Sequence, residues 1–566
     1  MEKTYRYKHN PIVRSILLAM LAPTILMNLT TAIGSMADTV IIGHYLDDLS
    51  LSVVTFATPI YMVINTFAAL FAVGGCIAMS IDSGKGEKHT ANKAFSMSLE
   101  LTVLVGIILL LTGIFFSGTV THWLGAGKDV FVSTQQYSKI VLMGSPLFML
   151  NIALAFFVRN DGRPTLSMAG MFSSIVVDII LNFVFVGYLD MGVSGAAYST
   201  VIGQAVSAVI ISSHFISRKN TLKFRFTFGK MIWRIIKNGT SSALHFVYQF
   251  LTILIINHFL SKLAGTNGVV IYTVVFNLCT VSLSVFEGIS QTIQPMISNY
   301  YGEKSYRSIR ETLRLAFIAV IIICGTVTLL LEAVPQVVPV IFGLDDASLI
   351  LDAAVAVRIF AVSMIITTVN VVIGYYLQST EQNFMAAIII SLRCFVLFLG
   401  ATLILGKLFG MNGVWAAYAA AEILTFIVIA VMVKLKQKKL SKKGRSVNML
   451  LLDIPVESSI GCYTCKCKDD DAEEYIHILK AQAVKNTEIK KEVFDDALAY
   501  LNVLLQMYEK KKGKYIEFEI NGAEGKIIIR DNLDHSKITD SLKASVKNGS
   551  TSDYGPVLGW NRMCIG

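Results

Sequence analysis

The sequence predicts an all-α polytopic membrane protein with about twelve spanning helices in two six-helix lobes, followed by a small α+β cytoplasmic domain. Three observations support this fold class. The 566-residue chain is 54% hydrophobic and only 16% charged, apolar segments recur up to Val433, and their order repeats itself. This composition excludes an ordinary soluble enzyme. We assign the net charge of +10 to cytoplasmic loops and not to nucleic-acid binding.

Each predicted span has about 20–30 residues, enough to cross a hydrocarbon layer of about 30 Å. The spans are expected at about 14–43, 51–80, 94–117, 137–158, 166–189, 192–217, 231–260, 268–298, 311–334, 355–378, 384–406 and 411–433. We therefore place an N-terminal lobe at residues 1–225, a C-terminal lobe at 226–435, and a basic linker with a cytoplasmic domain at 436–566. The basic N-terminus leads directly into the first span without a small-residue cleavage site, as in a signal anchor.

Loop charge predicts the orientation of the chain. Lys and Arg gather after the second, fourth, sixth, eighth and twelfth spans, for example at Lys85, Arg159 and Arg307. The alternate loops are poor in Lys and Arg and contain Asp190 and Asp345. An excess of positive charge on one set of loops marks the cytoplasmic side. We therefore expect a multi-pass protein of the plasma membrane with both termini in the cytoplasm.

Short motifs recur at nearly one offset. GEK at Gly86–Lys88 returns at Gly302–Lys304, and AAY at Ala196–Tyr198 returns at Ala416–Tyr418, so the offsets are 302 − 86 = 216 and 416 − 196 = 220 residues. Each copy stands at the same place in its half of the topology. Six spans followed by six in the same orientation form a parallel repeat, which predicts a substrate cavity between the halves with alternating access.

Asp38 is the only charged residue between Ser15 and Gly43. A carboxylate at the centre of a span costs about 2.5–3.5 kcal/mol on insertion scales, so it is a candidate functional residue. Counted along the helices, Asp38, Asn182 and Thr200 lie about 9, 10 and 12 Å below the outer surface, and Asp178 lies one turn below Asn182. These four oxygen-bearing side chains can hold Na⁺, or the carboxylates can share a proton.

The alternative interpretation of this layer is a polar cluster that only packs helices. The second repeat has no such layer, because the observed offsets place Leu254 near the position equivalent to Asp38 and Phe398 at that of Asp178. The lobes share a scaffold, but only the first carries the acidic layer. This asymmetry favours a role for the carboxylates beyond holding the fold.

Several stretches resemble the multidrug and toxic compound extrusion (MATE) transporters over about residues 10–435. They include MADTVIIGHYLDDLSLSVV, DSGKGEKHTANKA, DIILNFVFVGYLDMGVSGAAYSTVIGQ and ISQTIQPMISNYYGEKSYRSIRETLRLA. The resemblance implies antiport, in which substrate leaves while Na⁺ or H⁺ enters. It also implies a cation site at Asp38, Asp178, Asn182 and Thr200. The sequence departs from the family pattern of Asn followed by Asp four residues later, because the order here is exchanged. Gln249 stands where some members have an acidic residue.

Four further residues are candidates for the substrate cavity: Glu287, Gln291, Arg393 and Glu422. Glu287, Arg393 and Glu422 are isolated charges inside predicted spans. Either glutamate can attract a cationic compound or form a structural pair with Arg393.

The tail after Arg445 is expected to form an α+β domain. We predict a strand at Asn448–Pro455, helices at Asp470–Ala483 and Glu488–Tyr508, and a hairpin of Lys514–Ile520 with Gly525–Arg530. Cys462, Cys465 and Cys467 form C-x-x-C-x-C, which can bind Zn²⁺ with Cys564 or His477 as a fourth ligand. The sequence has no second CxxC pair, so the alternative is that these cysteines bind no metal ion.

The order of EVFDDALAYLNVLL, a hairpin, RDNLD and YGPVLGWNRMCIG resembles the histidine-kinase-type ATPase fold of anti-sigma factors. Leu533 replaces the glycine expected two residues after Asp531. The resemblance therefore implies degenerate nucleotide binding and a regulatory module with a cytoplasmic partner.

The main functional hypothesis is a cation-coupled exporter of small organic, cationic compounds, with no enzymatic activity and no cofactor other than the coupling ion. A flippase for a lipid-linked substrate would favour a basic cavity, whereas the candidate residues here are mostly acidic. A membrane-anchored signalling protein that works through its tail leaves the acidic layer unexplained. No GxxxxGK[ST] loop occurs, so no primary ATPase is implied.

Overall fold

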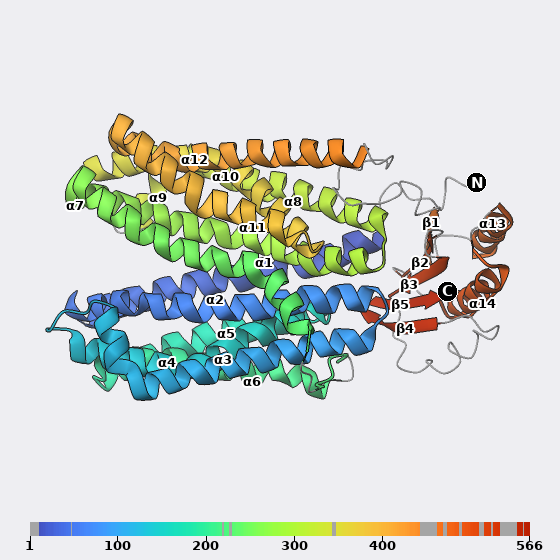
Figure 1. The fold of residues 1–566 in the computed structure, drawn as a ribbon, viewed down its shortest axis with the longest axis horizontal. Helices are drawn as coiled ribbons and strands as arrows, with labels where there is room; N and C mark the ends of the chain where they lie inside the picture. Colours follow the sequence, from blue (N-terminus) through green and yellow to red (C-terminus); the bar gives the residue numbers. More distant parts are fainter. Residues whose placement is uncertain are drawn as a thin grey trace.

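The computed structural model describes residues 11–46, 48–217, 220–225, 229–341, 347–441, 461–467, 472–485, 489–508, 514–521, 525–532, 552–558 and 560–565. Two helical lobes lie side by side, and a small domain of strands and helices sits at one end of them (Figure 1). Among these residues, ten helical segments are long and apolar enough to cross a membrane. The fold class predicted from the sequence is confirmed.

The N-terminal lobe consists of six long helices. They are α1 (Pro11–Tyr45), α2 (Asp48–Gly84), α3 (Lys88–Trp123), α4 (Phe131–Asn160), α5 (Pro164–Asn182) and α6 (Gly192–Ser212). A π-helical turn, η1 (Phe183–Tyr188), extends α5, and a 3₁₀ turn, η2 (Ser213–Ile216), extends α6. Apolar side chains such as Leu104, Ile108 and Phe115 are more than half exposed on α3. A face of this kind is suited to lipid and not to water.

The C-terminal lobe is built from fewer but longer helices. They are α7 (Met231–Gly302), α8 (Tyr306–Ala333), the short α9 (Val337–Ile341), α10 (Ala347–Ser379), α11 (Asn383–Ser391) and α12 (Leu397–Ser441). A π-helical turn, η3 (Leu392–Val396), joins α11 to α12.

Helix α7 contains two spans, and α12 contains the end of one span, begun by α11 and η3, and the whole of the next. A straight helix of the length of α7 would measure about 108 Å. Yet Gly239 near its start contacts Leu70, and Gly302 at its end contacts Ile81, both on α2. The chain must therefore reverse direction within α7. In α12, Gly410 interrupts the helix with φ +62° and ψ −141°, so the segments on either side are separate spans. Counted in this way, the helices agree with the predicted twelve spans.

The two lobes meet where glycines let backbones approach closely. A Cβ added to Gly239 on α7 would lie 1.9 Å from the carbonyl oxygen of Leu70 on α2. A Cβ on Gly302 would lie 2.1 Å from the carbonyl oxygen of Ile81. Small residues allow this kind of packing between membrane helices. The contact at Gly302 lies beside the C-terminal domain, because the next residue, Glu303, is bound by Arg562 of that domain.

Helix α1 belongs to both lobes. Ile12, Ile16 and Met20 in its first half pack into the apolar core of the C-terminal lobe, whereas Ile42 packs into that of the N-terminal lobe. Pro23 lies inside the helix between these regions. A proline there removes one helical hydrogen bond and allows the two halves to follow different lobes.

The C-terminal domain is an antiparallel sheet covered on one face by two helices. Its elements are β1 (Gly461–Lys466), α13 (Ala472–Lys485), α14 (Lys491–Tyr508), β2 (Tyr515–Asn521), β3 (Lys526–Asp531), β4 (Ser552–Val557) and β5 (Trp560–Ile565), with the strand order β1-β2-β3-β5-β4. The two predicted helices and the β2–β3 hairpin are confirmed. The predicted strand Asn448–Pro455 lies outside the described residues, and β1, β4 and β5 were not predicted.

One substitution tests the contact between the lobes. We expect Gly239→Ala to lower the apparent Tm of the purified protein in detergent by several degrees, because its methyl group collides with the Leu70 backbone. Overpacking of this kind costs about 1–3 kcal/mol. Gly325→Ala is the matched control, since Gly325 lies within α8 and nothing surrounds its Cβ position within 4 Å. Equal Tm values for the two variants would contradict this packing.

Candidate functional site

A cavity of about 610 Å³ lies between the two lobes. Helices α1, α2, α4, α5 and α6 line it from the N-terminal lobe, and α7, α10, α11 and η3 line it from the C-terminal lobe. Six of the residues predicted from the sequence line this cavity: Asp38, Asp178, Thr200, Glu287, Gln291 and Arg393. The other two, Asn182 and Glu422, bind lining residues from behind. The predicted cation-site residues and the predicted substrate-cavity residues therefore lie in or directly behind the wall of one cavity, whose size is typical for small organic ligands.

The predicted acidic layer forms one hydrogen-bonded group. The Asn182 amide Nδ2 donates to Asp38 Oδ1 at 3.0 Å and to Asp178 Oδ1 at 3.3 Å. Asp38, Asp178 and Thr200 all line the same cavity, and the Thr200 hydroxyl donates to the carbonyl oxygen of Ala196 at 2.9 Å. Three helices, α1, α5 and α6, contribute to the group. The exchanged order of Asp178 and Asn182 therefore still brings all four side chains together.

Among the described residues, no basic side chain neutralises this group. Within the described part of the chain, neither Asp38 nor Asp178 forms an ion pair with Lys, Arg or His. Asn182 is fully buried, and its amide oxygen Oδ1 has no hydrogen-bond partner. Buried polar atoms are normally satisfied, so an orphaned oxygen beside two carboxylates is suited to a cation. The donor set of carboxylate, amide and hydroxyl oxygens fits Na⁺, and the carboxylate pair also fits a shared proton.

The corresponding spans of the C-terminal lobe carry a different arrangement. Arg393 Nε contacts Glu422 Oε1 at 2.7 Å, and the Asn370 amide donates to Glu422 Oε2 at 2.8 Å. The Arg393 and Glu422 side chains are only 6% and 2% exposed. Leu254 is instead exposed and Phe398 packs against the apolar core. The sequence left Glu287 and Glu422 open as partners of Arg393, and in the structure the partner is Glu422. The C-terminal lobe therefore neutralises this buried charge with its own side chains.

Glu287 remains as the acidic residue on the C-terminal side of the cavity. Its side chain is 28% exposed, and its Oε1 lies 3.6 Å from Nε2 of His245. Gln249 lines the same cavity with an amide in place of a carboxylate. Glu287 can thus meet a ligand in the cavity, while Glu422 is engaged with Arg393.

Sequence reasoning missed two polar contacts at the cavity. Tyr61 and Tyr137 line it, and their hydroxyl groups are 3.1 Å apart. Asn151 donates to Gln204 Oε1 at 2.6 Å, behind the wall. The Tyr side chains have no local signal that distinguishes them from ordinary packing aromatics, because their pairing joins α2 to α4.

Arg159 was expected in a cytoplasmic loop, and this expectation is wrong. It lies in the last turn of α4, is only 1% exposed, and donates through Nη1 to Gln291 Oε1 of the other lobe at 2.9 Å. Its guanidinium also lies 4.5 Å from the ring centroid of Phe156. The helix continues past its predicted end, and the aromatic face and the amide together stabilise the buried cation.

The cysteine motif of the tail has a structural explanation for two of its members. Cys465 and Cys467 are two residues apart, so they share one face, and both pack into the core of the C-terminal domain. The position of the Cys462 side chain lies outside what the structure describes. In the part of the chain that the structure describes, no three His, Cys, Asp or Glu residues are placed to hold a metal ion. The zinc site therefore stays a prediction.

The MatE family model matches residues 23–184 and 241–404, which together are more than half of the chain. The multidrug export protein MepA of Staphylococcus haemolyticus (strain JCSC1435) is 24% identical over 444 residues, covering 77% of this chain and 97% of that protein. MepA of Staphylococcus aureus (strain NCTC 8325 / PS 47) is 23% identical over 448 residues, covering 78% and 97%. The residues matched by the family model leave out the C-terminal domain.

Solved structures show the same fold. An outward-facing multidrug resistance MATE family transporter of the MOP superfamily aligns with a TM-score of 0.72 at 20% identity, covering 77% of this chain and 99% of the other. The multidrug transporter DinF-BH in complex with R6G aligns with a TM-score of 0.68 at 25% identity, covering 75% and 96%.

The Arg393–Glu422 pair leads to a prediction about stability. We expect Glu422→Leu to lower the apparent Tm strongly, because removing one partner of a buried ion pair costs about 3–5 kcal/mol. Adding Arg393→Met to the same chain should recover most of the loss, since no uncompensated charge then remains. The measurement is thermal unfolding of the purified variants in detergent. If the double variant is as unstable as Glu422→Leu alone, the ion pair does not account for the burial.

Proposed function

We propose, from the premise that this chain belongs to the MatE family, that it is an antiporter coupled to Na⁺ or H⁺ that exports small organic, mostly cationic compounds by alternating access. The observation that carries this proposal is the group of Asp38, Asp178 and Asn182, in which no basic residue of the described part of the chain pairs with either carboxylate. The match to the MatE family and the similarity to multidrug export proteins support a role for this chain as a transporter in drug efflux. The coupling ion and the cationic nature of the substrate are our inference from the site.

The proposed coupling follows from competition for one negative charge. Asp38 and Asp178 would hold the coupling cation together with the Asn182 and Thr200 oxygens. When the carboxylates release it, they leave net negative charge on the cavity wall. In a site of low dielectric constant, that charge attracts a cationic substrate far more strongly than it would in water. Binding of either cation thus weakens binding of the other, which is the requirement for antiport.

The cavity supports a substrate that is both apolar and cationic. Aromatic walls from Tyr61, Tyr137 and Phe148 border the acidic group, and Glu287 adds a carboxylate from the opposite lobe. Arg393 does not reverse this polarity, because Glu422 neutralises it. A lipid-linked anionic substrate would require a basic cavity, so the flippase hypothesis is disfavoured. We propose no catalysis and no cofactor beyond the coupling ion, and membrane lipid and the substrate are the partners.

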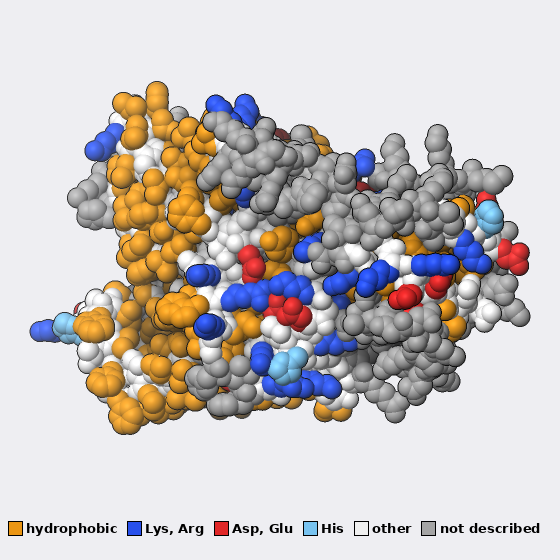
Figure 2. All heavy atoms as spheres, turned by 45° about the vertical axis from the view of Figure 1, so that its right-hand side comes forward, with side chains coloured by type: hydrophobic (Ala, Val, Ile, Leu, Met, Phe, Trp, Pro, Cys, Tyr) orange, Lys and Arg blue, Asp and Glu red, His pale blue; other side chains and the backbone are white. Residues whose placement is uncertain are grey.

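The distribution of charge supports the proposed orientation. Lys and Arg side chains form a band between the hydrophobic surface and the C-terminal domain (Figure 2). Positive charge beside one membrane face marks the cytoplasmic side. We therefore infer that the C-terminal domain and both termini face the cytoplasm of a cell with this protein in its plasma membrane, where the domain can meet a regulatory partner.

The coupling proposal is tested by gradient-driven transport. In vesicles that load a fluorescent organic cation, we expect Asp38→Asn to lower the rate driven by a Na⁺ or H⁺ gradient at least about tenfold, equivalent to about 1.4 kcal/mol. Asp178→Asn should act in the same way. Glu332→Gln is the matched control, because its side chain is 36% exposed on α8. If Asp38→Asn transports as fast as the control, the coupling site is wrongly assigned.

The role of Glu287 is tested by substrate charge. We expect Glu287→Gln to raise the KM for a cationic substrate about tenfold, because one attractive charge in the cavity is lost, at about 1.4 kcal/mol. The KM for a neutral substrate of similar size should stay unchanged. Equal increases for both substrates would indicate that Glu287 supports the shape of the cavity and not its charge selectivity.

A further inference from the structure

The sheet of the C-terminal domain has two different faces. Side chains alternate along β2, so Ile516, Phe518 and Ile520 pack under the helices α13 and α14. The residues between them, Glu517 and Glu519, point the other way. Both are no more than 1% exposed. A charged sheet face that is fully buried must be covered by another part of the protein, and each buried charge must find a partner there.

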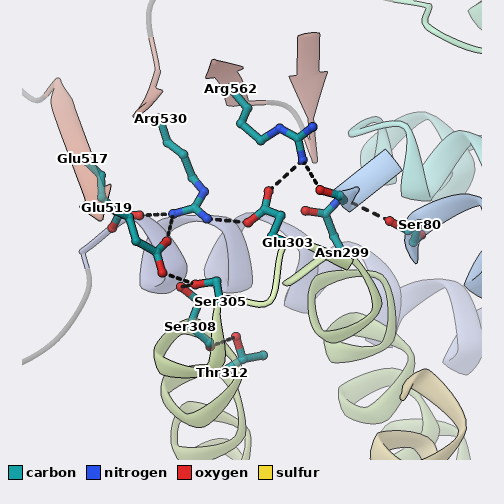
Figure 3. Close-up of polar contacts among 11 residues, drawn as sticks. Ser80, Asn299, Glu303, Ser305, Ser308, Thr312, Glu517, Glu519, Arg530 and Arg562 are labelled. Carbon is teal, nitrogen blue, oxygen red and sulfur yellow. Dashed lines mark hydrogen bonds and ion pairs between the residues drawn. The ribbon is translucent and has the colours of Figure 1, made fainter. Parts of the chain in front are cut away.

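That cover is the end of the membrane lobes, and Arg530 and Arg562 supply the contacts (Figure 3). Arg530 on β3 forms ion pairs with Glu303, Glu517 and Glu519. Arg562 on β5 contacts Glu303 Oε1 at 3.0 Å. Burial by itself lowers the pKa of Arg530, but the neighbouring carboxylates of Glu303, Glu519 and Glu517 raise that pKa well above its ordinary value. Glu303, which follows α7, is thus bound by two arginines of the domain.

The domain reaches both lobes at once. Nη1 of Arg562 contacts Glu303 of the C-terminal lobe and also donates to the carbonyl oxygen of Gly84, the last residue of α2, at 2.8 Å. Trp560, on the same strand, belongs to the apolar cluster that contains Ile16 of α1. The Ser305 hydroxyl adds a hydrogen bond of 2.6 Å to Glu519. A single strand therefore bridges the ends of α2 and α7.

The lobes also hold each other at this end. Arg234 on α7 pairs with Asp82 of α2 at 2.8 Å and with Glu381, beyond α10, at 2.7 Å. The Asn299 amide donates to the carbonyl oxygen of Ser80 at 3.4 Å. The domain thus adds a second layer of contacts outside an existing junction. Separation of the lobes here would break the inner layer, and Arg562 could then keep only one of its two contacts, Glu303 or the carbonyl oxygen of Gly84.

We propose that the C-terminal domain is a latch that joins α2 to α7 through Arg562 and Glu303 and stabilises the conformation in which the cavity is closed on the side of the domain. This inference rests on the proposed function, because alternating access requires the lobes to separate at that end. Undocking of the domain then favours opening toward its side. The latch gives the cytoplasm a means to regulate transport without touching the substrate cavity.

The test measures the separation of the lobes in the full-length protein. Spin labels are attached to cysteines introduced at His89 and Phe384, exposed positions near the latch end of the N- and C-terminal lobes, in a chain whose native cysteines are replaced by alanine. We expect Arg562→Gln to raise the ratio of long-distance to short-distance populations at least about tenfold, equivalent to about 1.4 kcal/mol. Lys480→Gln is the control, because Lys480 is exposed on α13, behind the opposite face of the sheet.

A second variant that ends at Ser441 keeps the test decisive if Arg562→Gln does not fold. Residues up to Ser441 contain the whole of the match to the MatE family model, at residues 23–184 and 241–404, so this variant keeps the part of the chain that the family shares. It should show the same shift to long distances. Unchanged distances in either folded latch variant, or an equal shift in Lys480→Gln, would overturn the latch.

Failure of the latch and failure of the proposed function give different results. The distance measurement needs neither substrate nor an ion gradient. Wild-type export with unchanged distances in the latch variants would refute the latch alone. Absence of gradient-driven export with the expected shift in distances would refute the antiport proposal and leave the domain as a structural clamp between the lobes.

Discussion

The constraint on which this structure depends is that a charged side chain inside a membrane must be neutralised, either by another side chain or by a bound ion. The two lobes meet it differently in corresponding spans. In the C-terminal lobe, Arg393 and Glu422 neutralise each other behind the cavity wall. In the N-terminal lobe, Asp38 and Asp178 share only the amide of Asn182, which leaves their charge uncompensated by the described protein. A repeated scaffold thus carries one closed charge pair and one site that requires a cation.

The position of the acidic group links that cation to movement of the lobes. Asp38 lies on α1, whose first half packs into the opposite lobe and whose second half packs into its own. A change in charge at Asp38 therefore acts on a helix that belongs to both lobes. At the far end of α2 and α7, close glycine contacts and ion pairs hold the same lobes together. The C-terminal domain adds its contacts at that end, so α1, α2 and α7 both line the cavity and carry contacts to the domain at their ends.

Much of this arrangement could be predicted because it depends on local sequence. Long apolar segments define the spans, and counting residues along a helix placed Asp38, Asn182 and Thr200 at similar depths. In the structure Asn182 donates to Asp38, and Thr200 lines the same cavity as Asp38. The β2–β3 hairpin was also found, because its alternating pattern and turn are local. The division of the membrane part into two consecutive six-span halves was predicted from two short motifs that each occur twice in the sequence.

What could not be predicted depends on contacts between distant segments. Arg159 and Glu303 resemble ordinary loop charges in the sequence, yet both are buried by partners more than 100 residues away. The partner of Glu303 lies in another domain, and no periodic pattern reports such a pairing. Strand β1 was missed because its cysteines suggested a metal motif, although Cys465 and Cys467 are core residues.

We infer that Asp38, Asp178 and Asn182 hold the cation that substrate displaces. Titration of the purified protein with a cationic substrate, while the released H⁺ and Na⁺ are counted, measures this displacement. At least one cation should be released per bound substrate in the wild type and none in the Asp38→Asn, Asp178→Asn double variant. Substrate binding without cation release in the wild type, or equal release in the double variant, would contradict it.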